Sequence, residues 1–196
     1  MTEQAHSPSM RVRNFPAANP RSLYGFHKDR LCGLHDLLRY AEGTSVLDIA
    51  MNHGLIGFEF ARYGAALVHG CDRHEPAVNA ARAIFSELAI PSRFEVVDLT
   101  GGPAALETAF GQHYLRRYDI VLFLGIYHKL KEQTSDPIIA ELIRHLVNRV
   151  ARFFVVRTGQ VMLLEELGAI LADTGLRRVH FSALSPVVGA VEIWAQ

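Results

Sequence analysis

The segment Ser45–Ala61 reads SVLDIAMNHGLIGFEFA and decides the fold. It opens with a short apolar run, Val46 to Ile49, which only Asp48 interrupts, and it closes with apolar residues at helical spacing. Small or turn-prone residues lie between the two parts: Ala50, Asn52 and Gly54. This order predicts a buried strand, a tight loop and a helix. Such a junction directs free N–H groups and the positive end of a helix dipole at a ligand, and small residues allow close approach.

The same segment resembles motif I of the class I S-adenosylmethionine (SAM)-dependent methyltransferases, written Asp-x-Gly-x-Gly-x-Gly. Asp48 matches the acid and Gly54 matches the last glycine. Ala50 and Asn52 stand where the family usually has glycine. Alanine is nearly as small as glycine, and asparagine tolerates a positive φ better than most residues. The resemblance implies that all four residues border a bound cofactor.

Length and composition indicate one globular domain. The chain has 196 residues, 49% of them hydrophobic, which is enough for a sizeable core. Basic and acidic residues balance at 20 each, so no global charge attracts nucleic acid or an anionic membrane. Cys32 and Cys71 have no disulfide-framework or zinc spacing. No apolar run has signal-peptide or membrane-spanning length. We therefore expect a cytoplasmic protein without a metal site or a membrane partner.

The chain is expected to divide into a tail and one domain. Residues 1–20 are polar and contain three prolines, which predicts a flexible tail. Residues 21–196 form the domain, and leucines at helical spacing predict a helix within residues 21–42. Class I methyltransferases often carry an N-terminal helix that covers the cofactor, so the resemblance implies a lid here. It places four residues of this segment near the methionine end of the cofactor, the first three as substrate contacts: Tyr24, His27, Lys28 and Arg30.

Two further acids follow predicted strands. An apolar run ends at Asp72, 24 residues after Asp48, which is the spacing of a strand-helix-strand unit. An acid at the end of the second strand of a doubly wound sheet can accept hydrogen bonds from both ribose hydroxyls, and we place Arg73 beside the cofactor with it. The third strand ends at Asp98 and Leu99. The resemblance implies that Asp98 bonds the adenine amino group and that Leu99 packs on the ring.

The run Tyr118–Leu124 predicts a fourth strand that is buried on both faces. Ligands bind at the carboxyl ends of the strands in such sheets, so Leu124 and Gly125 are expected to border the cofactor. The loop beyond resembles a Tyr-His-x-Leu stretch of several methyltransferases that act on oxygen. Histidine's ordinary pKa suits general base catalysis near neutral pH. Three neighbouring residues of this loop are our candidate catalytic groups: Tyr127, His128 and Lys129.

The C-terminal third completes the predicted sheet. A fifth strand, residues 152–156, leads into Arg157, which is a candidate to bind an anionic group of the substrate or to form a surface salt bridge. Residues 178–184 and 187–194 form two strands with a short link, which predicts an antiparallel pair. In a class I methyltransferase such a pair gives the order 3-2-1-4-5-7-6. We predict this α/β fold: a doubly wound seven-stranded sheet, last strand antiparallel, with helices on both faces.

The resemblance covers about residues 22–196 and implies SAM as the cofactor. It implies direct methyl transfer to a nucleophile held in line with the carbon–sulfur bond, a proximity effect. No insertion is long enough to be a separate substrate domain. A hydroxyl of a small molecule or sugar is our first choice of acceptor, with His128 as the base.

Three alternatives stay open. One is methylation of tRNA or another RNA, with Arg11 and Arg13 of the tail as contacts, although the lack of a basic RNA-binding appendage argues against a nucleic-acid partner. A second is a non-catalytic SAM-binding module, which Ala50 and Asn52 suggest. The third is an NAD-dependent oxidoreductase, which Asp72 alone allows, although Asn52 replaces the first glycine of G-x-G-x-x-G. The sequence does not name the acceptor or the oligomeric state.

Overall fold

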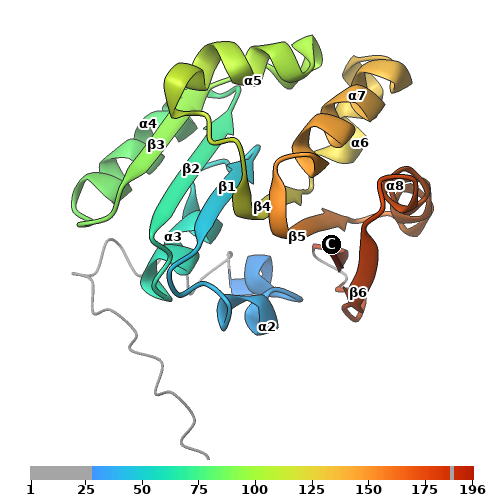
Figure 1. The fold of residues 1–196 in the computed structure, drawn as a ribbon, viewed down its shortest axis with the longest axis horizontal. Coiled ribbons are helices and arrows are strands. Elements are labelled where there is room, and N and C mark those ends of the chain that lie inside the picture. Colours follow the sequence, from blue (N-terminus) through green and yellow to red (C-terminus); the bar gives the residue numbers. More distant parts are fainter. Residues whose placement is uncertain (1–27, 186–187) are drawn as a thin grey trace, which may run out of the picture.

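A computed structural model describes residues 28–185 and 188–196, and a seven-stranded sheet runs through them (Figure 1). The strand order is β3-β2-β1-β4-β5-β7-β6. The strands are β1 Ser45–Ile49, β2 Leu67–Asp72, β3 Ser92–Val96, β4 Tyr118–Leu124, β5 Val150–Thr158, β6 Arg177–Phe181 and β7 Ala190–Ala195. The pairs among β1 to β5 are parallel, and β7 runs antiparallel to both β5 and β6. The predicted order and the antiparallel last strand are confirmed.

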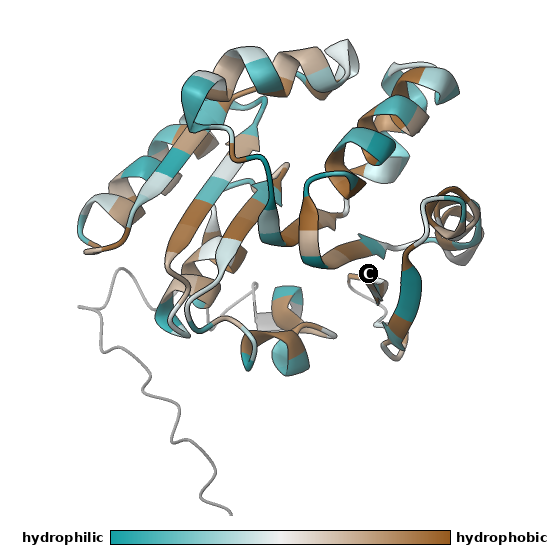
Figure 2. Cartoon of the chain, viewed as in Figure 1, coloured by the Kyte–Doolittle hydropathy of each residue, from teal (hydrophilic) through white to brown (hydrophobic). Residues whose placement is uncertain are grey.

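The sheet is covered by helices on both faces. The helices are η1 Lys28–Leu31, α2 His35–Leu38, α3 Leu55–Arg62, α4 Glu75–Ser86, η2 Leu99–Gly101, α5 Pro103–Phe110, η3 Gly111–His113, α6 Tyr127–Gln133, α7 Asp136–Val147 and α8 Val161–Ala172. Buried side chains of α2, α3 and α4 share one core cluster with one face of the sheet, and those of α5 to α8 share a second cluster with the other face. The central strands are mostly hydrophobic, whereas α7 carries both hydrophobic and hydrophilic residues (Figure 2).

The sheet positions a site between β1 and β4. Strand β1 pairs with β2 on one side and with β4 on the other, so Val46 lies opposite both Val68 and Ile120. The connections after β1 and after β4 leave toward opposite faces, because α3 belongs to one core cluster and α6 to the other. This is the topological switch point at which open α/β sheets form a crevice beyond the carboxyl ends of their strands.

Two local expectations differ from the structure. The leucine-rich segment within residues 21–42 is not one helix, because Gly33 adopts a left-handed conformation with φ 77° and separates η1 from α2. Its Leu34, Leu37 and Leu38 are buried in the core, as their spacing predicts. The residues that follow β4 are not a loop, since Tyr127 begins the helix α6.

Some sequence-based expectations lie outside the described residues. These are the tail of residues 1–20 and the predicted substrate contacts Tyr24 and His27. Lys28 begins η1. Within the described ranges, no helix is both long and apolar enough to cross a membrane.

Candidate active site

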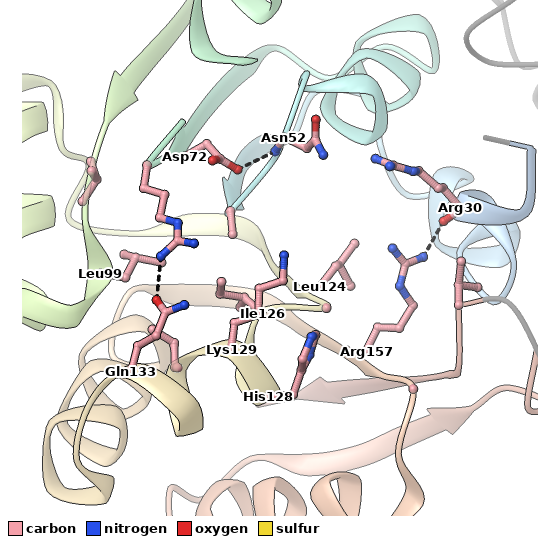
Figure 3. Close-up of a pocket in the computed structure, with 17 residues that line it drawn as sticks. Arg30, Asn52, Asp72, Leu99, Leu124, Ile126, His128, Lys129, Gln133 and Arg157 are labelled. Atoms are coloured by element: carbon pink, nitrogen blue, oxygen red, sulfur yellow. Dashed lines mark hydrogen bonds between the residues drawn. The ribbon is translucent and has the colours of Figure 1, made fainter. Parts of the chain in front are cut away.

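A cavity of about 410 Å³ opens at the carboxyl ends of β1, β2, β4 and β5 (Figure 3). The cavity brings together ten of the predicted site residues: Ala50, Asn52, Asp72, Arg73, Leu99, Leu124, Gly125, His128, Lys129 and Arg157. They come from five separate segments of the chain. Its volume falls in the range of pockets that enclose small molecules.

The loop after β1 adopts the backbone conformation that glycine favours. Ala50 and Asn52 both have φ 56°, in the left-handed region, and they are the non-glycine residues with positive φ among those described. Gly54 follows with φ 71° at the start of α3. These are the positions at which the resemblance expects glycine. The loop therefore has the shape of motif I, although side chains are present at two of its glycine positions.

Asp72 at the end of β2 is fixed by the backbone. Its Oδ2 accepts a hydrogen bond from the Asn52 N–H at 2.9 Å, and its Oδ1 accepts one from the His74 N–H at 2.9 Å. A carboxylate oxygen can accept more than one hydrogen bond, so each oxygen retains accepting capacity on the side of the cavity that Asp72 lines. The two N–H groups hold the carboxylate in place before a ligand arrives.

Asp48, in β1, does not line the cavity. Its side chain is 3% exposed, and it accepts a backbone hydrogen bond from Gly57. Its Oδ2 has no hydrogen-bond partner among the described residues. Burial raises the pKa of this carboxyl to about 7, whereas the nearby Arg157 guanidinium lowers it. Asp48 is thus a buried acid near the carboxyl end of β1, with one carboxylate oxygen that lacks a hydrogen-bond partner among the described residues.

The β3 side of the cavity is apolar, with a polar bridge across it. Val97 and Leu99 line the wall, and both are buried. The Arg73 guanidinium donates a hydrogen bond to Gln133 Oε1 at 2.7 Å, which joins the end of β2 to α6 (Figure 3). Asp98 does not line the cavity. Its Oδ1 accepts hydrogen bonds from the Thr100 N–H and hydroxyl, which lower its pKa.

The first turn of α6 presents His128 and Lys129 to the cavity, but not Tyr127. Tyr127 is 1% exposed and faces Glu166 of α8. Burial, followed by its hydrogen bond with Glu166, raises the pKa of Tyr127 to about 12. Successive helical residues point about 100° apart, so residues adjacent in sequence face different sides. Tyr127 therefore anchors α6 against α8. Of the three predicted catalytic residues, His128 and Lys129 are the two that line the cavity.

A second anchor fixes α6 from the same side. Lys131 Nζ lies 2.8 Å from Asp136 Oδ1 at the start of α7 and 2.7 Å from Glu166 Oε1 in α8. The two carboxylates raise the pKa of Lys131 well above its usual value. At the start of the segment, the Gly125 N–H donates to the Arg157 carbonyl at 2.8 Å. These contacts set the direction in which His128 and Lys129 face.

Arg157 at the end of β5 is buried rather than placed in a surface salt bridge. The residue is 7% exposed, and its Nη1 donates a hydrogen bond to the Arg30 carbonyl at 2.5 Å. Burial lowers the pKa of the guanidinium to about 10, whereas the nearby Asp48 raises it. Of the two interpretations of Arg157 from sequence, the structure excludes the surface salt bridge.

Sequence reasoning missed Gln133 as a residue of the cavity. It lies four positions after Lys129, on the same face of α6. That relation becomes visible only when the segment is interpreted as a helix. Val97 was also missed, although it directly precedes the predicted pair Asp98 and Leu99.

Comparisons with known proteins agree with this fold. No protein-family model and no curated protein matches the sequence. The structure does match a ribosomal protein L11 methylase from Lactobacillus delbrueckii subsp. bulgaricus, with a TM-score of 0.65 and 12% identity over 88% of this chain and 80% of that one. It also matches a TehB-like SAM-dependent methyltransferase from Corynebacterium glutamicum, with a TM-score of 0.58 and 15% identity over 85% and 88% of the two chains.

The 16S rRNA methylase RmtB is similar as well, with a TM-score of 0.59 and 15% identity over 87% of this chain and 64% of that one. A cyclase, SpnF, is a further match. Identities this low establish the fold alone, and one fold can host different chemistries. The predicted class I methyltransferase fold is confirmed. The acceptors that these proteins are named for include a protein and an RNA, so the fold does not select the acceptor.

Proposed function

We propose that the protein is a SAM-dependent methyltransferase that acts on a hydroxyl of a small molecule. The observation that carries this proposal is the composition of the cavity at the switch point. One end has a fixed carboxylate, Asp72, beside a left-handed loop. The other end has His128 and Lys129 on the first turn of α6. A binding module requires the first end but has no use for a proton acceptor at the second.

The β1 to β3 side of the cavity fits SAM. Asp72 offers a charged acceptor for ribose hydroxyls, and the wall formed by Val97 and Leu99 fits an adenine ring. The loop that carries Ala50 and Asn52 follows β1 and lines the same side of the cavity. The antiparallel β7 also favours this cofactor over NAD, since a plain dinucleotide-binding domain does not need such a strand.

When bound, the cofactor supplies a methyl group made electrophilic by the positive charge on its sulfur. The protein contributes alignment and proton transfer. We assign to His128 the removal of the proton from the acceptor hydroxyl as its oxygen bonds to the methyl carbon and the carbon–sulfur bond breaks. Lys129, next to His128, orients the acceptor. The buried strand β4 and the anchored helix α6 hold both groups in place.

A small acceptor is favoured because the polar groups gather inside a cavity of about 410 Å³. The 20 basic and 20 acidic residues give the chain no net charge for binding a polyanion. η1 supports a lid role for the N-terminal segment, because the Arg30 carbonyl binds Arg157 and Arg30 itself lines the cavity.

The test is a transfer assay with SAM carrying a tritiated methyl group. Pools of small hydroxylated compounds and bulk tRNA serve as separate acceptors. The proposal expects label in a small-molecule pool and its loss in His128→Ala. Label in tRNA alone would mean that the acceptor is RNA rather than a small molecule. SAM binding without transfer to any acceptor would favour the non-catalytic module.

A further inference from the structure

The cavity has an excess of positive charge that a neutral acceptor would leave unused. Four basic residues line it: Arg30, Arg73, Lys129 and Arg157. Asp72 is the one acidic residue among the lining residues, and it lies at the end that fits the cofactor. Arg73 is engaged with Gln133 near that same end. The other three cations have no acidic residue beside them in the lining.

The positions of these cations separate the two ends of the cavity. Figure 3 shows Arg30 and Arg157 toward one end, and Asp72 and Leu99 toward the other, with Lys129 between. Arg30 and Arg157 are tied together because the guanidinium of Arg157 donates to the backbone carbonyl of Arg30. The end nearer His128 is therefore the basic one.

Arg157 is the critical member because it is almost fully buried. A guanidinium is rarely buried without a partner, since removing a charge from water is costly. Among the described residues Arg157 forms no ion pair, and its one hydrogen bond goes to a neutral carbonyl. A guanidinium has five N–H donors, and the hydrogen bond to the Arg30 carbonyl uses only one of those of Arg157, which lines the cavity.

Asp48 does not remove this excess. It interacts electrostatically with Arg157 but forms no ion pair with it at contact distance among the described residues, and its buried carboxyl accepts a hydrogen bond from the Gly57 backbone. Lys129 and Arg30 likewise form no ion pair within the described part of the chain. Structural arginines of this protein behave differently: Arg149, for example, bonds Glu107 at 3.0 Å and packs over the Tyr114 ring.

We propose that the acceptor is an anion, a hydroxylated carboxylate or phosphate compound, whose charged group binds between Arg30 and Arg157 while its hydroxyl faces His128. The guanidinium fork of Arg157 suits the two oxygens of such a group. Lys129 adds a third charge from α6. This inference rests on the proposed function, because it names the acceptor class of that same site.

The test measures anion binding at Arg157 directly. The full chain is labelled with ¹⁵N-arginine, saturated with S-adenosylhomocysteine, and titrated at constant salt with acetate, with acetamide and with inorganic phosphate. The Nε–Hε resonance of Arg157 is identified by its loss in Arg157→Gln. Acetate and acetamide have nearly the same shape and differ in charge, so the pair isolates the charge requirement.

We expect a saturable shift with acetate or phosphate, with a Kd on the order of millimolar, and no saturable shift with acetamide. The anion with the lower Kd distinguishes a carboxylate acceptor from a phosphate one. Arg30→Gln should raise that Kd about tenfold through loss of one charge-assisted contact. Arg116→Gln, which removes an exposed arginine outside the cavity, should leave it unchanged.

Two results would overturn the inference. Equal shifts with acetate and acetamide would mean that charge is not recognised. Anion binding that is present in the free protein but absent with S-adenosylhomocysteine would assign Arg157 to the carboxylate of the cofactor. Calorimetry on the same samples separates the two proposals: failure to bind S-adenosylhomocysteine overturns the proposed function itself, whereas its binding without anion binding overturns this inference alone.

Discussion

Two regions of the core bury titratable groups, and they differ in how those groups are partnered. In the first, which we term the aromatic region, His69 Nδ1 lies 2.8 Å from the Tyr118 hydroxyl, which also accepts the Leu115 N–H at 3.2 Å. The imidazole stacks on Phe110 with ring centroids 5.6 Å apart. In the second, which we term the site region, Asp48 keeps an oxygen without a partner and Arg157 has one neutral partner.

The comparison separates stability from binding. Buried polar groups that serve packing are generally satisfied by the protein itself, and unsatisfied ones require an explanation. The aromatic region meets this rule at His69 and Tyr118, although the hydroxyl of the neighbouring Tyr114 is buried without a partner among the described residues. The site region breaks the rule beside a cavity, at Asp48. We therefore expect changes in the aromatic region to alter stability and changes in the site region to alter ligand binding or turnover.

The largest expected effect contrasts two histidines. His128→Ala should lower methyl transfer by about 10²–10⁴-fold, because general base catalysis contributes about that factor, and should leave the thermal midpoint near that of the wild type. His69→Ala should instead lower the free energy of unfolding by about 2–4 kcal/mol, through a lost hydrogen bond and a cavity, with S-adenosylhomocysteine affinity unchanged. Transfer kinetics and chemical denaturation of both variants measure the contrast.

Full turnover in His128→Ala would mean that alignment alone drives the reaction. A large loss of stability in that variant would assign His128 to packing, in conflict with its partial exposure at the cavity.

The next effect concerns pH. Burial raises the pKa of Asp48 to about 7 in the folded protein from its ordinary value of 3.8, so the folded state binds the proton more tightly than the unfolded chain. The contribution of Asp48 to stability is therefore fully present below pH 4 and is lost as pH rises to 7, by up to about 4 kcal/mol. Asp48→Asn should gain stability relative to the wild type across this window, as measured by urea unfolding.

His69 provides the opposite case. Burial lowers its pKa to about 4 from 6.5, so its neutral form stabilises the folded state above pH 6.5 and that contribution is lost as pH falls toward 4. Asp48→Asn and the wild type both contain His69, so the difference in their free energies of unfolding cancels the histidine's effect. It isolates the contribution of the Asp48 carboxyl. A difference that is constant from pH 4 to 7 would contradict the raised pKa of Asp48.

Tyr118→Phe is a smaller test of the aromatic region. It removes the hydroxyl that pairs with His69 and with the Leu115 N–H, and should lower the free energy of unfolding by about 1–3 kcal/mol. Affinity for S-adenosylhomocysteine should not change. Tyr40→Phe is the control, because Tyr40 is 44% exposed and its loss of a hydroxyl should have little effect. Weaker cofactor binding in Tyr118→Phe would remove the distinction between the two regions.

The smallest effect uses one substitution at two positions. Ala50→Gly should raise the free energy of unfolding by about 0.5–1 kcal/mol, because Ala50 has φ 56° and glycine adopts that conformation without strain. Ala83→Gly, on the exposed face of α4, should lower it by about 1 kcal/mol. Thermal unfolding of both variants shows whether each substitution raises or lowers stability. A loss of stability in Ala50→Gly would show that the left-handed loop is not strained.

The sequence predicts the sheet well because each buried strand is a short apolar run and the connections have regular lengths. Ala50 and Asn52 are also located correctly, since the spacing from Asp48 to Gly54 fixes the loop. The helix α6 was missed because, apart from the buried Leu130, its residues from His128 to Gln133 are polar and show no apolar periodicity. The burial of Arg157 depends on a contact with Arg30, 127 residues away in the chain, and no local pattern encodes it.

The central claim is that Asp72 and the left-handed loop bind SAM, and calorimetry with its demethylated product tests this claim most directly. The wild type should bind S-adenosylhomocysteine saturably and more tightly than NAD. Asp72→Asn, which preserves size but removes the charge, should weaken that binding by about 1–3 kcal/mol, or roughly 5- to 150-fold. Tighter binding of NAD, or equal affinity of the wild type and Asp72→Asn for S-adenosylhomocysteine, would contradict the account.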